Sequence, residues 1–366
     1  MAHIVFLRTA AADLTAGKPP LRGVPASAPL SAAAAAIPAS QEADVAVWRD
    51  GASPLAPATA TVIGLLSSLD VVAFLASHLG DAAAAMRTPA GDVVAHEPAL
   101  VREVEPHTSF QFVRARLIEI VELMKQGARR VLVRKNITEA CTVVDKKPFA
   151  PFYKAVLKIT GTPRAAASAK AVGRPPPPSA FGCDRYCCLT REDIIRFLIN
   201  CLGALAPTPL QSISSLGAVN RGYAHVEASS PAIESSWRVP SEPRAVAVVQ
   251  TNRDGSHKVL ADVSAHRLWR RDYAAAADSM ASLSSLNFAA GVDGHGMVAP
   301  GDESSRLGGR KAAFESSLVG QMMMASHGGN AALRCRSTSS LAAVMAQMLS
   351  YRTTHIWVTE GENDVL

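Results

Sequence analysis

Two stretches of the sequence are nearly the same. GLLSSLDVVAFL at residues 64–75 and CCLTREDIIRFL at residues 187–198 align without a gap. Each has an apolar start, a hydroxyl residue, an aspartate three positions later, two β-branched residues and a Phe-Leu pair. A repeat of this kind constrains the fold strongly, because each copy forms the same supersecondary unit and neighbouring copies share a core. We therefore expect a chain built from repeated units.

Each copy indicates a strand followed by a helix. In the first copy residues 61–66 are strand-like, and apolar residues then recur at helical spacing. Ser67 with Asp70, and Thr190 with Asp193, have the spacing of a helix N-cap and an N3 carboxylate. Because Ser/Thr-x-x-Asp starts helices in any protein, capping alone is the alternative to a binding role for these four residues.

The order helix, strand, strand, helix recurs along the chain. Before the second copy, the pattern predicts a helix from residue 117, ended by Gly127, and a strand at 131–133. A third set has a helix capped by Ser230 with Pro231 at its first position, and strands at 245–251 and 258–264. A fourth set begins with an apolar helical face in residues 341–349, followed by a strand at 355–358.

The repeats give four predicted units and two segments without periodicity. The predicted units are 10–80, 96–202, 207–285 and 331–366, of which we expect the third to be degenerate and the fourth incomplete. Residues 161–182 contain four consecutive prolines and predict a disordered insert in the second unit. Residues 286–330 are rich in Gly, Ser and Met and predict a low-complexity linker.

Composition narrows the class of protein. The net charge of +6 and the pI of about 9.1 fit anionic ligands such as phosphates, whereas aromatic residues at only 5% do not favour nucleic-acid binding. Six cysteines without a C-x-x-C pair predict a reducing, intracellular compartment, which we expect to be the cytoplasm and also the nucleus. No apolar run reaches about 18 residues, so no membrane helix is expected. No catalytic dyad and no metal-ligand spacing stand out, which predicts a protein that is not an enzyme and has no metal site.

The repeated pattern resembles the CBS motif, named after cystathionine β-synthase. Four such motifs in one chain resemble the γ regulatory subunit of AMP-activated protein kinases. A narrower resemblance, to plant CBS-domain-containing proteins, is carried by DLTAGKP, VWRD, SSLDVVAFL, MKQGARRVLV, SSLAAVMAQMLS and the stretch beginning YCCLTREDIIRFL. The resemblance implies an α/β fold of tandem β-α-β-β-α units, paired into pseudo-two-fold modules with ligand clefts between the paired motifs.

The resemblance also implies ligand-binding residues. In relatives that bind adenosine nucleotides the signature aspartate contacts the ribose hydroxyls and the Ser/Thr lies near the phosphate or sugar, which nominates Ser67, Asp70, Thr190 and Asp193. A carboxylate can accept hydrogen bonds from two vicinal hydroxyls, and helix N-terminal amides favour an anion.

A basic residue before the middle strand of each motif grips phosphate in the family. This nominates Arg129, Arg130 and His355, although solvated arginines at a strand entrance and a structural histidine are the simpler alternatives. Unit 1 has Asp44 at this position, which is hostile to phosphate, and in unit 3 Arg267 replaces the signature aspartate. We therefore expect at most two of the four sites to keep the signature.

Two functions follow from the resemblance. In the first, the chain senses cellular energy by binding AMP, ADP or ATP between paired motifs, and modulates a partner such as a protein kinase catalytic subunit. In the second, the CBS fold is kept as a scaffold for protein interactions and ligand binding has been lost. An unpaired fourth unit would expose apolar surface, so self-association is also expected.

Overall fold

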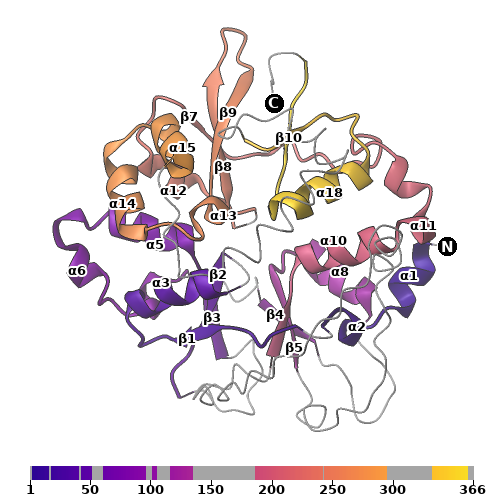
Figure 1. Cartoon of the computed structure of the whole chain (residues 1–366), viewed down its shortest axis with the longest axis horizontal. Coiled ribbons are helices and arrows are strands. Elements are labelled where there is room, and N and C mark those ends of the chain that lie inside the picture. The colour runs from indigo at the N-terminus through magenta and orange to yellow at the C-terminus, as the bar shows by residue number, and fades with distance from the viewer. Residues whose placement is uncertain are drawn as a thin grey trace, which may run out of the picture.

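The computed structural model describes residues 2–15, 18–40, 43–51, 61–95, 101–104, 116–134, 186–241, 243–294 and 332–361. The described elements form four small units that lie around a common centre (Figure 1). Three units contain a three-stranded sheet, and the described part of the fourth contains a two-stranded sheet. This arrangement confirms the α/β fold of tandem units.

Units 1 and 2 have the order strand, helix, strand, strand, helix. The elements of unit 1 are β1 (Gly23–Pro25), α3 (Leu30–Ala39), β2 (Asp44–Trp48), β3 (Val62–Ser67) and α5 (Ser68–Ala76). The elements of unit 2 are β4 (Val101–Val104), α8 (Leu117–Lys125), β5 (Arg130–Arg134), β6 (Tyr186–Leu189) and α10 (Arg191–Asn200). In both sheets the first strand pairs parallel to the second, and the second pairs antiparallel to the third.

Units 3 and 4 repeat this pattern. The elements of unit 3 are β7 (His225–Glu227), α12 (Ile233–Arg238), β8 (Ala245–Thr251), β9 (His257–Ser264), α13 (Ala265–Leu268) and α14 (Tyr273–Ser282). The described elements of unit 4 are β10 (Arg334–Cys335), α18 (Leu341–Tyr351) and β11 (Trp357–Val358). As in the other units, the first strand of each sheet is parallel to its neighbour.

Short helices outside the four units lie in the segments that precede each unit. They are α1 (Ala2–Arg8), α2 (Ala11–Thr15), η1 (Leu79–Asp81), α6 (Ala82–Ala85), α7 (Ala90–Val93), α11 (Leu202–Leu205), η6 (Thr208–Leu210) and α15 (Ser285–Gly294). Isolated bridges join Ala10 with Arg116, Pro89 with Pro29, Ser212 with Ser340, and Ser284 with Pro231. The segment before each unit thus reaches the helix start of the other unit of its pair. This reciprocal exchange defines two pairs, units 1 and 2 and units 3 and 4.

The middle strands bury both of their faces. In β5, Val131 and Val133 pack in the core beneath the helices of unit 2, whereas Leu132 points into the interface with unit 1. Side chains alternate across a strand, so a strand between two layers must be apolar at every position. This explains why the middle strands appear in the sequence as unbroken apolar runs.

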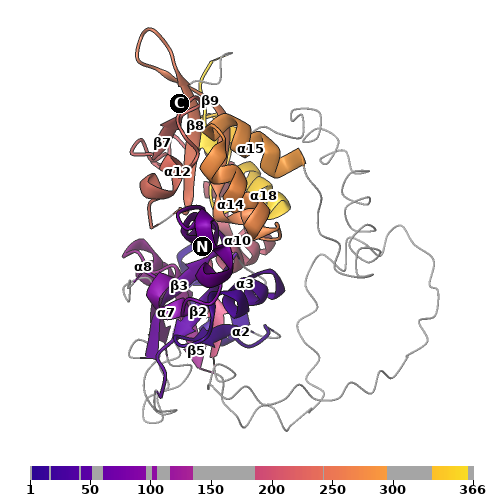
Figure 2. The same cartoon turned by 90° about the vertical axis from the view of Figure 1, so that its left-hand side faces the viewer.

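The pairs form through sheets and then join through helices. The sheets of units 1 and 2 meet where the rings of Trp48 and Tyr186 stack with centroids 6.1 Å apart, and Trp357 of unit 4 packs on the sheet of unit 3. Across the pairs, α5 packs against α13 and α14, and α10 packs against α18. Figure 2 shows α3, α10, α14 and α18 on one side of the strands. The centre is therefore a place where all four units meet.

Two predicted helices differ in the structure. The helix predicted to begin at Pro231 begins at Ile233, because Pro231 forms the bridge that anchors the exchanged segment before α15. The repeated order of helix, strand, strand, helix predicts one helix after the second strand of unit 3, where the chain forms two, α13 and α14. Asp272 accepts hydrogen bonds from the backbone N of Ala274 and Ala275, and so starts a new helix.

The predicted linker 286–330 differs at its start. Residues 285–294 form α15, and Phe288 is only 1% exposed in the core shared by units 1 and 3. Burial of the large apolar side chain of Phe288 stabilises a helix in a stretch whose composition alone predicts a linker. The rest of that segment and the predicted insert at 161–182 lie outside the described residues.

Candidate functional site

The repeated signature forms a capping box in both units. The backbone N of Ser67 donates to Asp70 Oδ2 at 2.8 Å, and the backbone N of Thr190 donates to Asp193 Oδ2 at 2.9 Å. In return the Ser67 and Thr190 hydroxyls accept from the backbone N of their aspartates at 3.3 and 3.4 Å. Capping is therefore one role of all four nominated residues.

Each signature aspartate also has a cation from elsewhere in the chain. Arg244 of unit 3 forms an ion pair with Asp70 and donates to Ser67 Oγ at 3.2 Å. Lys18, in the segment before unit 1, forms an ion pair with Asp193 and donates to the carbonyl of Cys188 at 2.7 Å. The carboxylates expected to contact ribose thus hold internal cations in this structure.

Asp44 lies against the two arginines that precede and begin β5. Its carboxylate accepts from Arg129 Nη2 at 2.6 Å and from Arg130 Nη2 at 2.7 and 2.8 Å. The side chains of Asp44 and Arg129 are each 5% exposed. Burial by itself raises the pKa of Asp44, but the charges of Arg130 and Arg129 and the hydrogen bond from Arg130 together hold that pKa below its usual value. Asp44 is therefore ionised at neutral pH.

Units 3 and 4 also have a buried aspartate between basic side chains. Asp262 of β9 is buried, and its two oxygens lie 2.9 Å from Arg267 Nη2 and 3.3 Å from His355 Nε2. Burial raises the pKa of Asp262, but the hydrogen bond from His355 and the charge of Arg267 outweigh it and leave the pKa lowered. The third basic residue nominated for phosphate, His355, thus lies beside a carboxylate as well.

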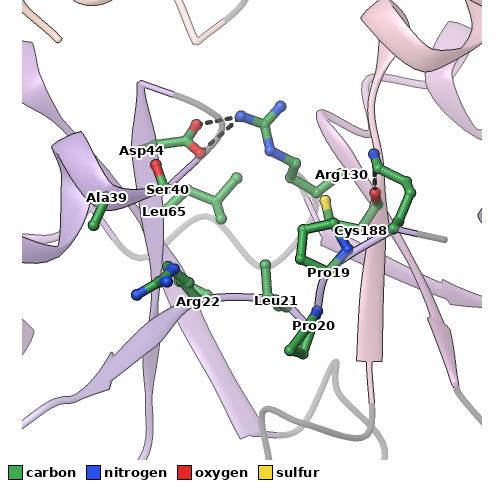
Figure 3. Close-up of a pocket in the computed structure, with 12 residues that line it drawn as sticks. Pro19, Pro20, Leu21, Arg22, Ala39, Ser40, Asp44, Leu65, Arg130 and Cys188 are labelled. Atoms are coloured by element: carbon green, nitrogen blue, oxygen red, sulfur yellow. Dashed lines mark hydrogen bonds and ion pairs between the residues drawn. The ribbon is translucent and has the colours of Figure 1, made fainter. Parts of the chain in front are cut away.

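A first cleft lies between units 1 and 2. Its empty volume is about 670 Å³, part of which is open to solvent. The residues that line it include Lys18, Leu21, Arg22, Asp44, Arg130 and Cys188. Figure 3 shows Asp44 and Arg130 facing each other from the two units, with the segment Pro19–Pro20–Leu21 crossing between the sheets. The cleft has both apolar and charged walls, as a small-molecule site requires.

A second cleft lies at the centre, where all four units contribute. Its empty volume is about 740 Å³, part of which is again open to solvent. Its charged and titratable lining residues are Asp44 of unit 1, Arg129, Arg130, Arg191 and Glu192 of unit 2, Arg244 and His266 of unit 3, and Arg352 of unit 4. Asp44 and Arg130 line both clefts, so the two spaces meet at this ion pair.

The second cleft is strongly basic. Five arginines face two carboxylates there, and burial followed by the charge of Arg352 lowers the pKa of His266 to about 4. The Nε atom of Arg244 is buried and has no hydrogen-bond partner among the described residues. Arg352 adopts a left-handed conformation with φ of 51°, which is uncommon for a residue with a side chain. Its guanidinium lies 5.0 Å from the centre of the Trp269 ring.

Known proteins show the family of this chain. The CBS domain-containing protein CBSX6 of Arabidopsis thaliana is 37% identical in an alignment that covers 98% of this chain and 90% of that protein. This chain belongs to the CBS domain-containing proteins. A second CBS domain-containing protein of the same plant, CBSX5, is 24% identical over 96% of this chain and 91% of that protein. No family model matches the chain.

A solved structure supports the CBS fold. Protein MJ1225 from Methanocaldococcus jannaschii, described as a candidate archaeal homologue of g-AMPK, superposes with a TM-score of 0.54. The match covers 98% of this chain and 95% of that one at 10% identity, so it concerns the fold alone. The family and the fold both agree with a chain of tandem CBS motifs.

Several residues that line the clefts were not predicted from the sequence. Arg244 stands before β8 as Arg129 stands before β5, so the rule that nominated Arg129 could also have found Arg244. Lys18, Arg191, His266 and Arg352 had no such signal, because tertiary packing brings each of them to a cleft. Within the described ranges, no group of three or more His, Cys, Asp or Glu side chains lies close enough to hold a metal ion. None of the helices in the described part of the chain is long and apolar enough to cross a membrane.

Proposed function

We propose that this CBS-domain protein is a non-enzymatic regulatory protein that binds an adenosine nucleotide and modulates a protein partner. The observation that carries the proposal is the basic central cleft, to which all four motifs contribute side chains. Arginine side chains suit phosphate because their planar guanidinium groups make paired hydrogen bonds to its oxygens. The unpartnered Nε of Arg244 is a further donor at this place among the described residues.

A ligand in the central cleft touches both pairs at once. Arg191 belongs to the first pair, whereas Arg244 and Arg352 belong to the second. A phosphate held by these side chains stabilises one relative orientation of the pairs, and a partner that binds both pairs responds to that orientation. We propose a protein kinase as this partner, in keeping with the fold.

Ribose binding at the signature requires an exchange of partners. Asp70 and Asp193 are paired with Arg244 and Lys18, so vicinal hydroxyls must replace a cation at the carboxylate. Arg244 also lines the central cleft, where a nucleotide phosphate offers it a new anion. In this exchange Arg244 moves from Asp70 to the phosphate, and the ribose hydroxyls take its place at Asp70. The Asp70 carboxylate therefore keeps hydrogen-bond partners throughout.

Calorimetric titration with AMP, ADP, ATP and S-adenosylmethionine tests the proposal. We expect saturable binding of at least one adenine nucleotide, and its loss in the Asp70→Asn, Asp193→Asn double variant. The control is Asp272→Asn, which changes an aspartate that caps α14 and lines neither cleft. Absence of binding by the wild-type chain at about millimolar nucleotide would refute a nucleotide-regulated function.

One observation favours a scaffold function instead. Every nominated side chain has an internal partner: Asp44 holds Arg129 and Arg130, Asp262 holds His355, and the signature aspartates hold Lys18 and Arg244. In a scaffold these ion pairs fix the four motifs in place, and partner binding is the same with and without nucleotide. Affinity capture of partners by wild-type chain and by the Asp70→Asn, Asp193→Asn variant, each with and without AMP, separates the two functions. Light scattering of the same preparations tests the predicted self-association.

A further inference from the structure

Asp44 occupies a position that is basic in the neighbouring motif. It is paired in register with Ser67, the residue that caps the following helix. In unit 2, Val131 is paired with Leu189, which places Arg130 opposite the capping residue Thr190. The corresponding positions of the two motifs thus carry opposite charges, and they meet at the junction of the two clefts.

The contact is built as an anion site. Two guanidinium groups from consecutive residues converge on one carboxylate through three hydrogen bonds of 2.6 to 2.8 Å. The side chains of Asp44 and Arg129 are each 5% exposed and that of Arg130 is 13% exposed, so water competes little for them. A phosphate or carboxylate of a ligand would need these same donors to bind at this point.

We propose that Asp44 is a specificity-determining residue: it is the chain's own anion at the junction of the clefts, and it excludes ligands that carry several negative charges. The proposal rests on the proposed function for its biological meaning, but not for its test. Asp44 pairs with both arginines in this structure, so a ligand meets only the remaining charge of the cleft.

The charges lining the central cleft support this selection. Five arginines oppose Asp44 and Glu192 there, so the lining carries an excess of positive charge that Asp44 reduces. A phosphate monoester carries about two negative charges at neutral pH, whereas polyphosphates carry more. The carboxylate of Asp44 therefore repels a polyphosphate more strongly than a single phosphate.

Asp44 does not lose its negative charge by protonation at neutral pH. Its arginine neighbours keep its pKa below the usual value despite burial. Removing its charge by substitution takes the Asp44 carboxylate away from Arg129 and Arg130, which is costly unless another anion enters. This gives the proposal a direct test by anion rescue.

The experiment compares wild-type chain with Asp44→Asn and uses inorganic phosphate and inorganic tripolyphosphate as probes. Thermal unfolding and calorimetric titration are recorded for both proteins. We expect Asp44→Asn to unfold at a lower temperature and to recover, with a saturable increase of roughly 5 °C at an anion concentration about a hundred times the dissociation constant. Wild-type chain should show a smaller increase. The affinity for tripolyphosphate should rise by about tenfold or more in the variant.

Two further variants sharpen the comparison. Asp262→Asn removes the buried carboxylate of the second pair, which lines neither cleft, and it should be destabilised without gaining anion binding. Asp44→Asn with Arg130→Met removes both sides of the main ion pair, and it should lose the gain in anion affinity. If Asp44→Asn misfolds in dilute buffer, recovery of its fold by phosphate supports the proposal, and failure of both anions to restore it overturns the proposal.

Equal anion responses of wild-type chain, Asp44→Asn and Asp262→Asn would also overturn it. A gain in tripolyphosphate binding by Asp44→Asn remains meaningful if no nucleotide binds the wild-type chain. In that case the selection by Asp44 stands while the nucleotide function fails. Nucleotide binding by wild-type chain with no gain in the variant would leave the nucleotide function standing and refute the selection, so the two proposals fail separately.

Discussion

Acidification should destabilise the folded chain through His266. Burial, followed by the charges of Arg352 and His355, lowers the pKa of His266 from 6.5 to about 4. The unfolded chain therefore takes up a proton as the pH falls through about 6.5, whereas the folded chain takes it up only near pH 4. Stability from this group is complete above the unfolded pKa and is lost as the pH falls toward the folded pKa.

The size of the effect follows from the two pKa values. One proton is taken up across this interval, and each pH unit is worth about 1.4 kcal/mol, so the full loss is about 3 kcal/mol. By about pH 5 the loss amounts to roughly 2 kcal/mol. The lowered pKa values of Asp44 and Asp262 act at lower pH, because the ordinary pKa of an aspartate is already 3.8. The interval above about pH 5 therefore reports mainly on histidine.

Urea unfolding followed by circular dichroism measures this loss. The free energies of unfolding of wild-type chain and His266→Gln should differ in their change between about pH 7.5 and pH 5, by roughly 2 kcal/mol. The control is His78→Gln, at an exposed position on the C-terminal side of α5 that lines neither cleft. Parallel pH dependences for wild-type chain and His266→Gln would contradict the effect of burial and charge ascribed to His266.

Four further substitutions test the fold. Phe288→Ala should lower the free energy of unfolding by about 3–5 kcal/mol, because it empties a fully buried place under α15, and urea unfolding checks this. Gly64→Ala should cost about 1–3 kcal/mol in the same assay, because a Cβ there would lie 2.3 Å from the backbone oxygen of Ala95; an unchanged midpoint contradicts this close approach. Ser67→Ala and Thr190→Ala should each cost about 1 kcal/mol through loss of the caps of α5 and α10, and similar thermal midpoints to wild-type chain would refute the capping geometry.

Local features could be predicted because the forces that produce them act over a few residues. The hydroxyl and carboxylate of each capping box are three residues apart, and apolar periodicity marks the strands and helices. The strand predicted at residues 245–251 matches β8. The linker at residues 286–330 was predicted from composition and not from periodicity, and α15 occupies its first residues.

The sequence by itself determined that the chain consists of repeated motifs and that each signature starts a helix. Only the tertiary structure decided which charges meet. Asp44 and Arg129 are 85 residues apart, Asp70 and Arg244 are 174, and Lys18 and Asp193 are 175. No periodicity connects such positions. They meet because strands that are apolar on both faces must be covered by a partner sheet on one side and by helices on the other, and that packing brings the polar strand ends of four motifs to one centre.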